Sequence, residues 1–189
     1  MNKLAVYCGA SMGADPLFAD TARDLGTEMA RRGIDLVYGG GHRGLMGVVA
    51  DAVLAQGGRV YGVIPKALVD LEVAHTGLTE LHTVTSMHER KAKMTELTDA
   101  FIAIPGGIGT LDELFEAWTW NALGYHSKPF CLLNVAGFWD GLIGFVDHVT
   151  ESGFMSPARR AQLLVADDIG EAIEKLDAAT KAAETRMVW

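Results

Sequence analysis

Residues 100–113 read AFIAIPGGIGTLDE, and their pattern is the strongest indication of the fold class. It begins with the continuous apolar run Ala100–Ile104, continues through a glycine-rich loop over Pro105–Thr110, and enters a segment of helical period at Leu111. A short run that is apolar on both faces is typical of a strand in a parallel sheet covered by helices on both sides. Glycines at the start of a helix leave consecutive N–H groups open to an anion such as phosphate. The stretch therefore predicts a strand–loop–helix unit with an anion site at the loop.

The same alternation of short apolar runs and longer helical segments extends over the whole chain. The expected strands are Leu4–Cys8, Asp35–Tyr38, Val60–Ile64, Leu81–Thr85, Ala100–Ile104, Pro129–Leu133 and Gln162–Val165. The expected helices are Pro16–Arg32, Leu45–Gln56, Met87–Thr98, Leu111–Leu123, Trp139–Ser152 and Ile169–Lys181. We therefore expect an α/β fold, a Rossmann-like doubly wound parallel sheet of about seven strands with helices on both faces. No repeat or linker divides residues 1–189, so a single domain is expected.

The chain is acidic and has few cysteines. Its 189 residues carry a formal net charge of −8, and neither a basic run nor a long apolar segment occurs among them. Nucleic acid and membranes are therefore not expected as partners. Cys8 and Cys131 both lie in apolar runs, so buried thiols in a reducing, cytoplasmic compartment are expected. The six histidines have no close ligand spacing, and no metal site is expected.

A second glycine-rich loop, GGGHRGLMG, spans residues 39–47 after the second expected strand. It contains a G-x-G-x-x-G pattern, but the segment Val60–Pro65 lacks the acidic residue that would bind the ribose of NAD. Two interpretations remain open: a tight turn with close helix–sheet packing, or a loop where a nucleotide approaches the backbone. On the second interpretation, the candidate nucleotide-contacting residues of the strand-to-helix loops are Gly9, Ser11, Gly40, Gly41, Gly44 and Met87.

Two charged residues occupy positions where structural and functional interpretations compete. Arg90 shares an apolar helix face with Met87 and Met94, so it needs an anion, a cavity, or a structural role as a snorkelling or ion-paired side chain. Glu113 follows Thr110 with the Thr-x-x-Glu spacing of a capping box, so it is either a helix cap or a catalytic carboxylate.

The segment Leu111–Tyr125 is more apolar than one core-facing helix stripe requires. This surplus predicts an interface between subunits, and a homodimer is the expected assembly.

Three motifs together resemble the LOG family, the cytokinin riboside 5′-monophosphate phosphoribohydrolases that are often labelled lysine decarboxylases. The motifs are GGGHRGLMG over residues 39–47, MHERK over residues 87–91 and PGGIGTLDE over residues 105–113. The resemblance implies a Rossmann-like homodimer, without a cofactor, that hydrolyses the N-glycosidic bond of a nucleoside 5′-monophosphate. The products would be an adenine-type base and ribose 5-phosphate. A non-catalytic carrier of a nucleotide or of molybdenum cofactor remains an alternative, and a pyridoxal-dependent decarboxylase is another.

The resemblance also implies the residues of the site. Catalytic roles fall on Arg90 and Glu113. The implied substrate-binding residues are Glu72, Arg90, Lys91, Gly106, Gly107, Ile108, Gly109, Thr110, Leu111, Asp112, Glu113 and Thr119. Asp112 stands where many members carry Glu, and His42-Arg43 stands where many plant members carry Ser-Ile. The preference between adenine and N6-prenylated adenine stays open.

Overall fold

The structure is a computed structural model that describes residues 1–69 and 74–186. Its seven strands form one sheet, in the order β4-β3-β2-β1-β5-β6-β7, and each neighbouring pair is parallel. The strands are β1 (Lys3–Tyr7), β2 (Asp35–Tyr38), β3 (Val60–Pro65), β4 (Glu80–Val84), β5 (Ala100–Ala103), β6 (Phe130–Leu133) and β7 (Leu163–Ala166). The expected Rossmann-like, doubly wound α/β sheet is therefore confirmed.

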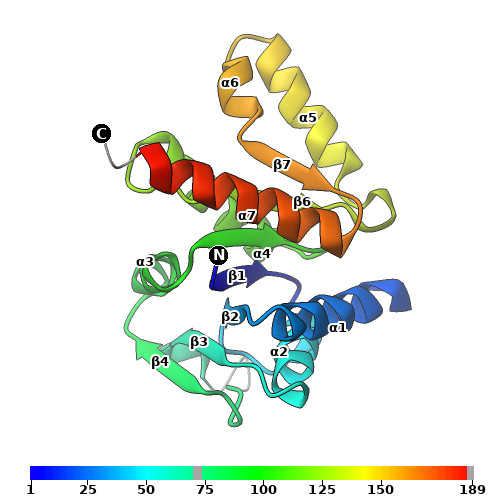
Figure 1. The fold of residues 1–189 in the computed structure, drawn as a ribbon, viewed down its shortest axis with the longest axis vertical. Helices are drawn as coiled ribbons and strands as arrows, with labels where there is room; N and C mark the ends of the chain where they lie inside the picture. Colours follow the sequence, from blue (N-terminus) through cyan, green and yellow to red (C-terminus); the bar gives the residue numbers. More distant parts are fainter. Residues whose placement is uncertain (70–73, 187–189) are drawn as a thin grey trace.

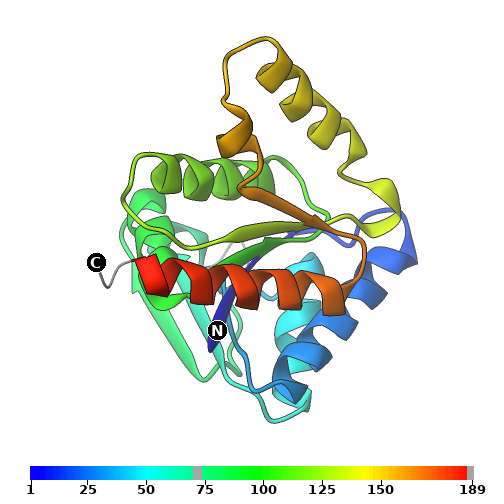
Figure 2. The same cartoon turned by 45° about the horizontal axis from the view of Figure 1, so that its top comes forward.

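Helices cover both faces of the sheet (Figures 1 and 2). They are α1 (Pro16–Arg31), α2 (Gly44–Ala55), α3 (Met87–Leu97), α4 (Ile108–Ala122), α5 (Asp140–Glu151), α6 (Pro157–Arg160) and α7 (Ile169–Arg186). Buried residues of α1, α2 and α7 pack on one face, whereas those of α3, α4 and α5 pack on the other. The short α6 was not among the expected helices, and with α5 it projects beyond the sheet in Figure 1.

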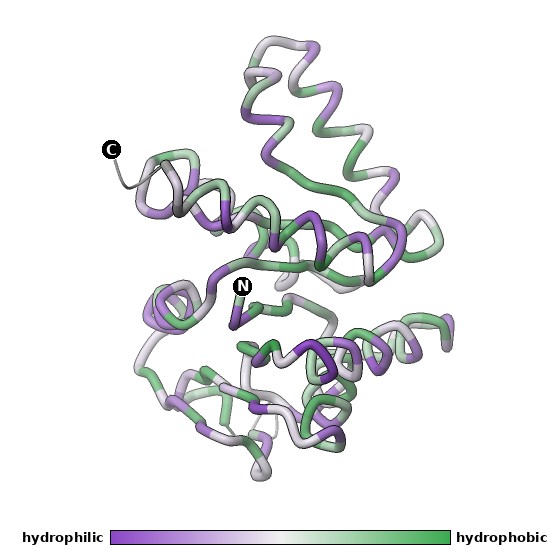
Figure 3. The backbone as a smooth tube through the Cα atoms, viewed as in Figure 1, coloured by the Kyte–Doolittle hydropathy of each residue, from purple (hydrophilic) through white to green (hydrophobic). Residues whose placement is uncertain are grey.

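Alternate residues of the inner strands supply the two cores. Leu4 and Val6 of β1 face the α1/α2/α7 side, and Ala5 and Tyr7 face the α3/α4/α5 side. Strands buried on both faces are therefore largely apolar, and the hydrophobic colouring of strands such as β6 and β7 in Figure 3 contrasts with the mixed colouring of the helices and of the edge strand β4. Among the described residues, no helix is both long and apolar enough to cross a bilayer.

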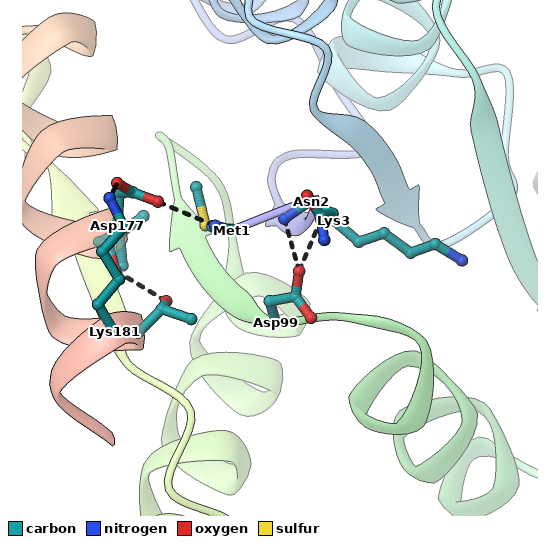
Figure 4. Close-up of polar contacts among 8 residues, drawn as sticks. Met1, Asn2, Lys3, Asp99, Asp177 and Lys181 are labelled. Atoms are coloured by element: carbon teal, nitrogen blue, oxygen red, sulfur yellow. Dashed lines mark hydrogen bonds and ion pairs between the residues drawn. The ribbon is translucent and has the colours of Figure 1, made fainter. Parts of the chain in front are cut away.

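The amino-terminal end of β1 is tied to its neighbours by polar contacts (Figure 4). The amino group of Met1 forms an ion pair of 2.9 Å with Asp177 on α7. One carboxylate oxygen of Asp99, the residue before β5, accepts the backbone N–H groups of Asn2 at 2.7 Å and Lys3 at 2.9 Å. These contacts hold β1 against β5 and α7 at the amino-terminal ends of the strands, which lie opposite the strand-to-helix loops.

The order of the strands creates a crevice between β1 and β5. From β1 the chain builds the sheet outward to β4, then returns to add β5, β6 and β7 on the other side of β1. The loops that follow β1 and β5 therefore diverge to opposite faces, and in sheets of this kind ligands bind in the crevice between such loops.

Candidate active site

A pocket of about 450 Å³ lies at the carboxyl ends of β1 and β5. Its walls come from the loop after β1, the start of α2, the turn after β3, the start of α3, and the loop and first turns of α4. The lining residues are Cys8, Ala10, Ser11, Met46, Leu68, Met87, Arg90, Gly107, Ile108, Gly109, Thr110, Asp112 and Glu113. A smaller pocket of about 200 Å³ shares Ser11 and Gly107 with it and includes Gly9 and Gly106.

Helix α4 begins earlier than the sequence suggested. Its first residue is Ile108, and Gly107 is the N-cap, without a side-chain capping bond. The interpretation of Thr110 and Glu113 as a capping box is therefore wrong, because Thr110 lies inside the helix and not at its cap. A first turn without a capping side chain leaves its backbone N–H groups to a ligand.

Glycines shape the loop that precedes α4. A Cβ on Gly106 would lie 2.1 Å from Oγ1 of Thr110, so only glycine fits there. A Cβ on Gly107 or Gly109 would meet nothing within 4 Å, so the backbone at both residues faces open space. The loop is held to the end of β1 by a 3.1 Å hydrogen bond from the N–H of Gly9 to the carbonyl of Pro105.

Glu113 lines the pocket from the second turn of α4 and is half-buried. Its negative charge affects the pKa of two side chains, Tyr7 at the end of β1 and Cys8 just after it. Burial, then the negative charges of Glu113 and Glu116, raise the pKa of Tyr7 well above its usual value, and the positive charge of Arg90 lowers it. Burial and then Glu113 also raise the pKa of the Cys8 thiol, which remains protonated. Charges of both signs therefore act on Tyr7 at the end of β1.

Arg90 is buried beneath the pocket, with only 4% of its surface exposed. Helix α3 begins at Met87 because the hydroxyl of Ser86 caps it by accepting the N–H of Glu89 at 3.1 Å, and this start turns Arg90 inward. Its Nε donates to the carbonyl of Val63 at 3.1 Å, and its Nη2 donates to the carbonyl of Gly39 at 3.0 Å. The snorkelling interpretation is wrong at this burial, whereas the expected inward cation beside a cavity is confirmed.

Lys91 faces α4 and does not line the pocket. Its Nζ forms ion pairs with Asp112 at 2.8 Å and Glu116 at 2.7 Å. Burial lowers the pKa of Lys91, but the bonds to the two carboxylates outweigh burial and raise it above the usual value. The side chain therefore joins α3 to α4 beside Glu113.

The loop over residues 39–47 serves close packing. A Cβ on Gly44 would lie 2.3 Å from the backbone of Ala10 and Ser11, and one on Gly47 would lie 2.1 Å from the carbonyl oxygen of His42. Gly40 has a positive φ of 79°, and Gly41 bridges to Ala74. These contacts support the tight-turn interpretation, and from this segment only Met46 lines the pocket among the described residues.

Not every residue that the resemblance implies lines the pocket. Glu72 falls outside the described residues, so the structure does not test its place. Thr119 is exposed on α4 and is absent from the lining of the pocket, as is Leu111. Conversely, sequence reasoning missed Cys8, Ala10, Met46 and Leu68 as lining residues. Cys8, Ala10 and Met46 are sequence neighbours of the glycine-loop residues Gly9, Ser11 and Gly47. This adjacency was the signal in the sequence that could have identified them as lining residues.

His42, Asp51 and His75 come together although they are distant in sequence, and their ligand atoms lie within 4.8 Å of one another. Nδ1 of His75 accepts the N–H of Gly77 at 3.0 Å, which places the ring proton on Nε2, and Nε2 lies 2.9 Å from Asp51. The imidazole thus uses both nitrogens in structural hydrogen bonds. The His75 side chain therefore holds residues 74–77 against α2 through its hydrogen bond with Asp51.

Three comparisons identify what the chain is similar to. A family model described as possible lysine decarboxylase matches residues 46–176. The cytokinin riboside 5′-monophosphate phosphoribohydrolase LOG of Oryza sativa subsp. japonica is 46% identical over 188 residues, which cover 100% of this chain and 78% of the relative. The cytokinin riboside 5′-monophosphate phosphoribohydrolase of Rhodococcoides fascians is 47% identical over 173 residues, which cover 91% of this chain and 87% of the relative.

A solved molybdenum cofactor carrier protein from Chlamydomonas reinhardtii has a TM-score of 0.71, with 94% of this chain and 97% of that chain covered. Its sequence identity of 19% indicates a shared fold and no more.

A pyridoxal-dependent lysine decarboxylase would require a lysine amine in the pocket to form the Schiff base with the cofactor. No lysine lines the pocket among the described residues, and Lys91 is engaged by two carboxylates. These residues do not fit that cofactor. The full-length matches at 46–47% identity carry the assignment instead, and the chain belongs to the LOG family of cytokinin riboside 5′-monophosphate phosphoribohydrolases.

Proposed function

We propose that this chain hydrolyses the N-glycosidic bond of adenosine 5′-monophosphate or of its N6-prenylated form. The products are the free adenine-type base and ribose 5-phosphate. The observation that carries the proposal is the joint placement of Arg90, Glu113 and the first turn of α4 around one pocket. The names of the curated relatives support the same activity.

The backbone N–H groups of residues 108–110 hold the 5′-phosphate in this proposal, because a helix N-terminus binds anions. Heterolysis of the C1′–N9 bond sends the bonding electrons to the base and leaves positive charge on the ribose. The Glu113 carboxylate stabilises that charge or accepts a proton from the attacking water. The water oxygen bonds to C1′, and the departing base takes up a proton. Arg90 orients the phosphate or polarises the leaving base.

The remaining implied contacts, from Glu72, Lys91, Leu111, Asp112 and Thr119, stay predictions. We further propose one catalytic domain over residues 1–189, supported by the single sheet. A homodimer is supported by the exposed apolar side chains of α4. The two free buried cysteines support a cytoplasmic location, since thiols persist in a reducing compartment.

Base release from nucleotides and from their nucleosides tests the proposal. The purified protein is given adenosine monophosphate, isopentenyladenosine monophosphate and the two matching nucleosides, and the free base is quantified by chromatography. Because several charge-assisted phosphate bonds would be lost, kcat/KM for each nucleoside should be lower by about 10²-fold or more. Equal values for nucleoside and nucleotide would refute the phosphate site. Nucleotide binding without base release would indicate a carrier.

A further inference from the structure

The backbone of Gly39 lies directly against the guanidinium of Arg90. Gly39 follows the end of β2, and its carbonyl accepts a 3.0 Å hydrogen bond from Nη2 of Arg90. Val63, near the end of the adjacent strand β3, accepts from Nε at 3.1 Å. Two carbonyl oxygens, one after β2 and one on β3, thus accept hydrogen bonds from two nitrogens of the planar guanidinium. These bonds fix the plane of the guanidinium as well as its position.

The absence of a side chain at Gly39 is part of the same contact. A Cβ there would lie 2.0 Å from Nη2 of Arg90, much closer than atoms can approach, and 3.1 Å from its Cζ, which is a tight contact. The backbone of Gly39 has no positive φ, so alanine is compatible with its local conformation. The clash therefore falls on the far end of one side chain and not on the main chain.

Other glycines of the same loop have a different role. At Gly44 and Gly47 an added Cβ would strike backbone atoms at 2.3 Å and 2.1 Å, so these two glycines preserve the packing of the loop itself. Only at Gly39 is the atom within 3.0 Å the head group of a charged side chain that lines the pocket.

From this geometry we infer that Gly39 is a positioning residue, whose carbonyl and missing side chain set the place of the Arg90 guanidinium in the substrate pocket. The inference rests on the proposed function, in which Arg90 contacts the substrate. In this inference, the glycine-rich loop over residues 39–47 acts on the reaction through the position of the Arg90 guanidinium.

The test is a double-mutant cycle of Gly39→Ala and Arg90→Lys, with base release from isopentenyladenosine monophosphate as the measured reaction. Gly39→Ala should lower kcat by about 10- to 100-fold, the scale of a misplaced catalytic group, with a smaller change in KM. Its melting temperature should stay within about 4 °C of wild type. Gly144→Ala is the matched control, because a Cβ at this exposed position of α5 meets nothing within 4 Å, and its kcat should equal that of wild type.

The double variant separates positioning from a general effect of the loop. The Arg90→Lys side chain lacks the guanidinium atoms that the new Cβ would strike, so adding Gly39→Ala to Arg90→Lys should reduce kcat little further. If the two losses multiply independently, the inference is wrong. It is also wrong if Gly39→Ala retains wild-type kcat while Arg90→Lys is impaired, and in that case the proposed function still stands.

Wild-type kcat in Arg90→Lys would instead overturn the role of Arg90 in the proposed function, and the positioning role with it. If the Gly39→Ala variant does not fold, the melting curve of the double variant shows whether the added Cβ clashes with the Arg90 guanidinium or with the backbone. A folded double variant shows that the clash lies with the guanidinium and supports the inference. An unfolded one places the clash in the backbone and refutes it.

Discussion

Glu113 lines the pocket from the second turn of α4 and does not cap that helix. The spacing Thr110-x-x-Glu113 matches a capping box, but Gly107 is the cap and Glu113 lies in the second turn. The sequence alone could not choose between Gly107 and Thr110, because both residue types occur at N-caps. The Glu113 carboxylate therefore does not cap α4, and it lies in the wall of the pocket.

We predict that Glu113→Gln lowers kcat by about 10²–10⁴-fold, because glutamine can neither carry negative charge nor accept a proton from water. The free energy of unfolding should change by about 1 kcal/mol or less, since no cap is lost. Steady-state base release and urea denaturation measure the two effects.

Glu116→Gln is the control for this prediction. It neutralises a carboxylate on the same helix, which pairs with Lys91 and does not line the pocket. It should keep most of the wild-type kcat. Similar losses in both variants would mean that the net charge of α4 matters and that Glu113 has no special role.

Among the elements, α3 and α4 are joined by Lys91. Its ammonium bridges Asp112 and Glu116. The Lys91 side chain is only 15% exposed, whereas the side chains of Asp112 and Glu116 are 56% and 22% exposed. Removal of the lysine would leave two carboxylates of like charge close together without a cation between them. This contact fixes the spacing of the helices that carry Arg90 and Glu113.

We predict that Lys91→Met lowers the free energy of unfolding by about 1–2 kcal/mol, between the values for exposed and buried ion pairs. Lys93→Met, which removes a more exposed pair with Glu96 inside α3, should cost about 0.5 kcal/mol or less. Urea denaturation of both variants gives the comparison. Equal stabilities of the two variants would contradict a structural role for Lys91.

Most of the elements could be predicted closely because they depend on local periodicity, whereas α6 was missed and α4 begins three residues earlier than expected. Strands β2 and β5, for example, begin where the apolar runs predicted, and α3 begins at Met87 as expected. The glycine loop could not be resolved in the same way. Gly39 meets Arg90 across 51 positions of sequence, and a G-x-G-x-x-G pattern is the same whether it faces a phosphate or a guanidinium. The approach of His42, Asp51 and His75 likewise depends on tertiary packing.

At the scale of the whole molecule, one side of α4 exposes large apolar side chains. Leu123 is 65% exposed and Tyr125, just after the helix, is 74% exposed. Beside them lies a groove of about 520 Å³, whose lining includes Trp120, His126 and Lys128. Thr119, which the family resemblance implies in substrate binding, is also exposed on α4. A second copy placed against this face would bury the apolar side chains and cover Thr119.

We predict that the wild-type protein is a homodimer and that the substitution Leu123→Asp causes the dimer to dissociate. Light scattering of the wild type should give twice the chain mass of 20.3 kDa, and a two-fold axis places each substitution at the interface twice. Burial of a leucine contributes about 1.5–3 kcal/mol, so two losses should weaken association by about 10²-fold or more. Phe145→Asp on α5, at a position that is 61% exposed, is the control and should remain dimeric. A monomeric wild type, or dissociation by Phe145→Asp alone, would show that α4 does not form the interface.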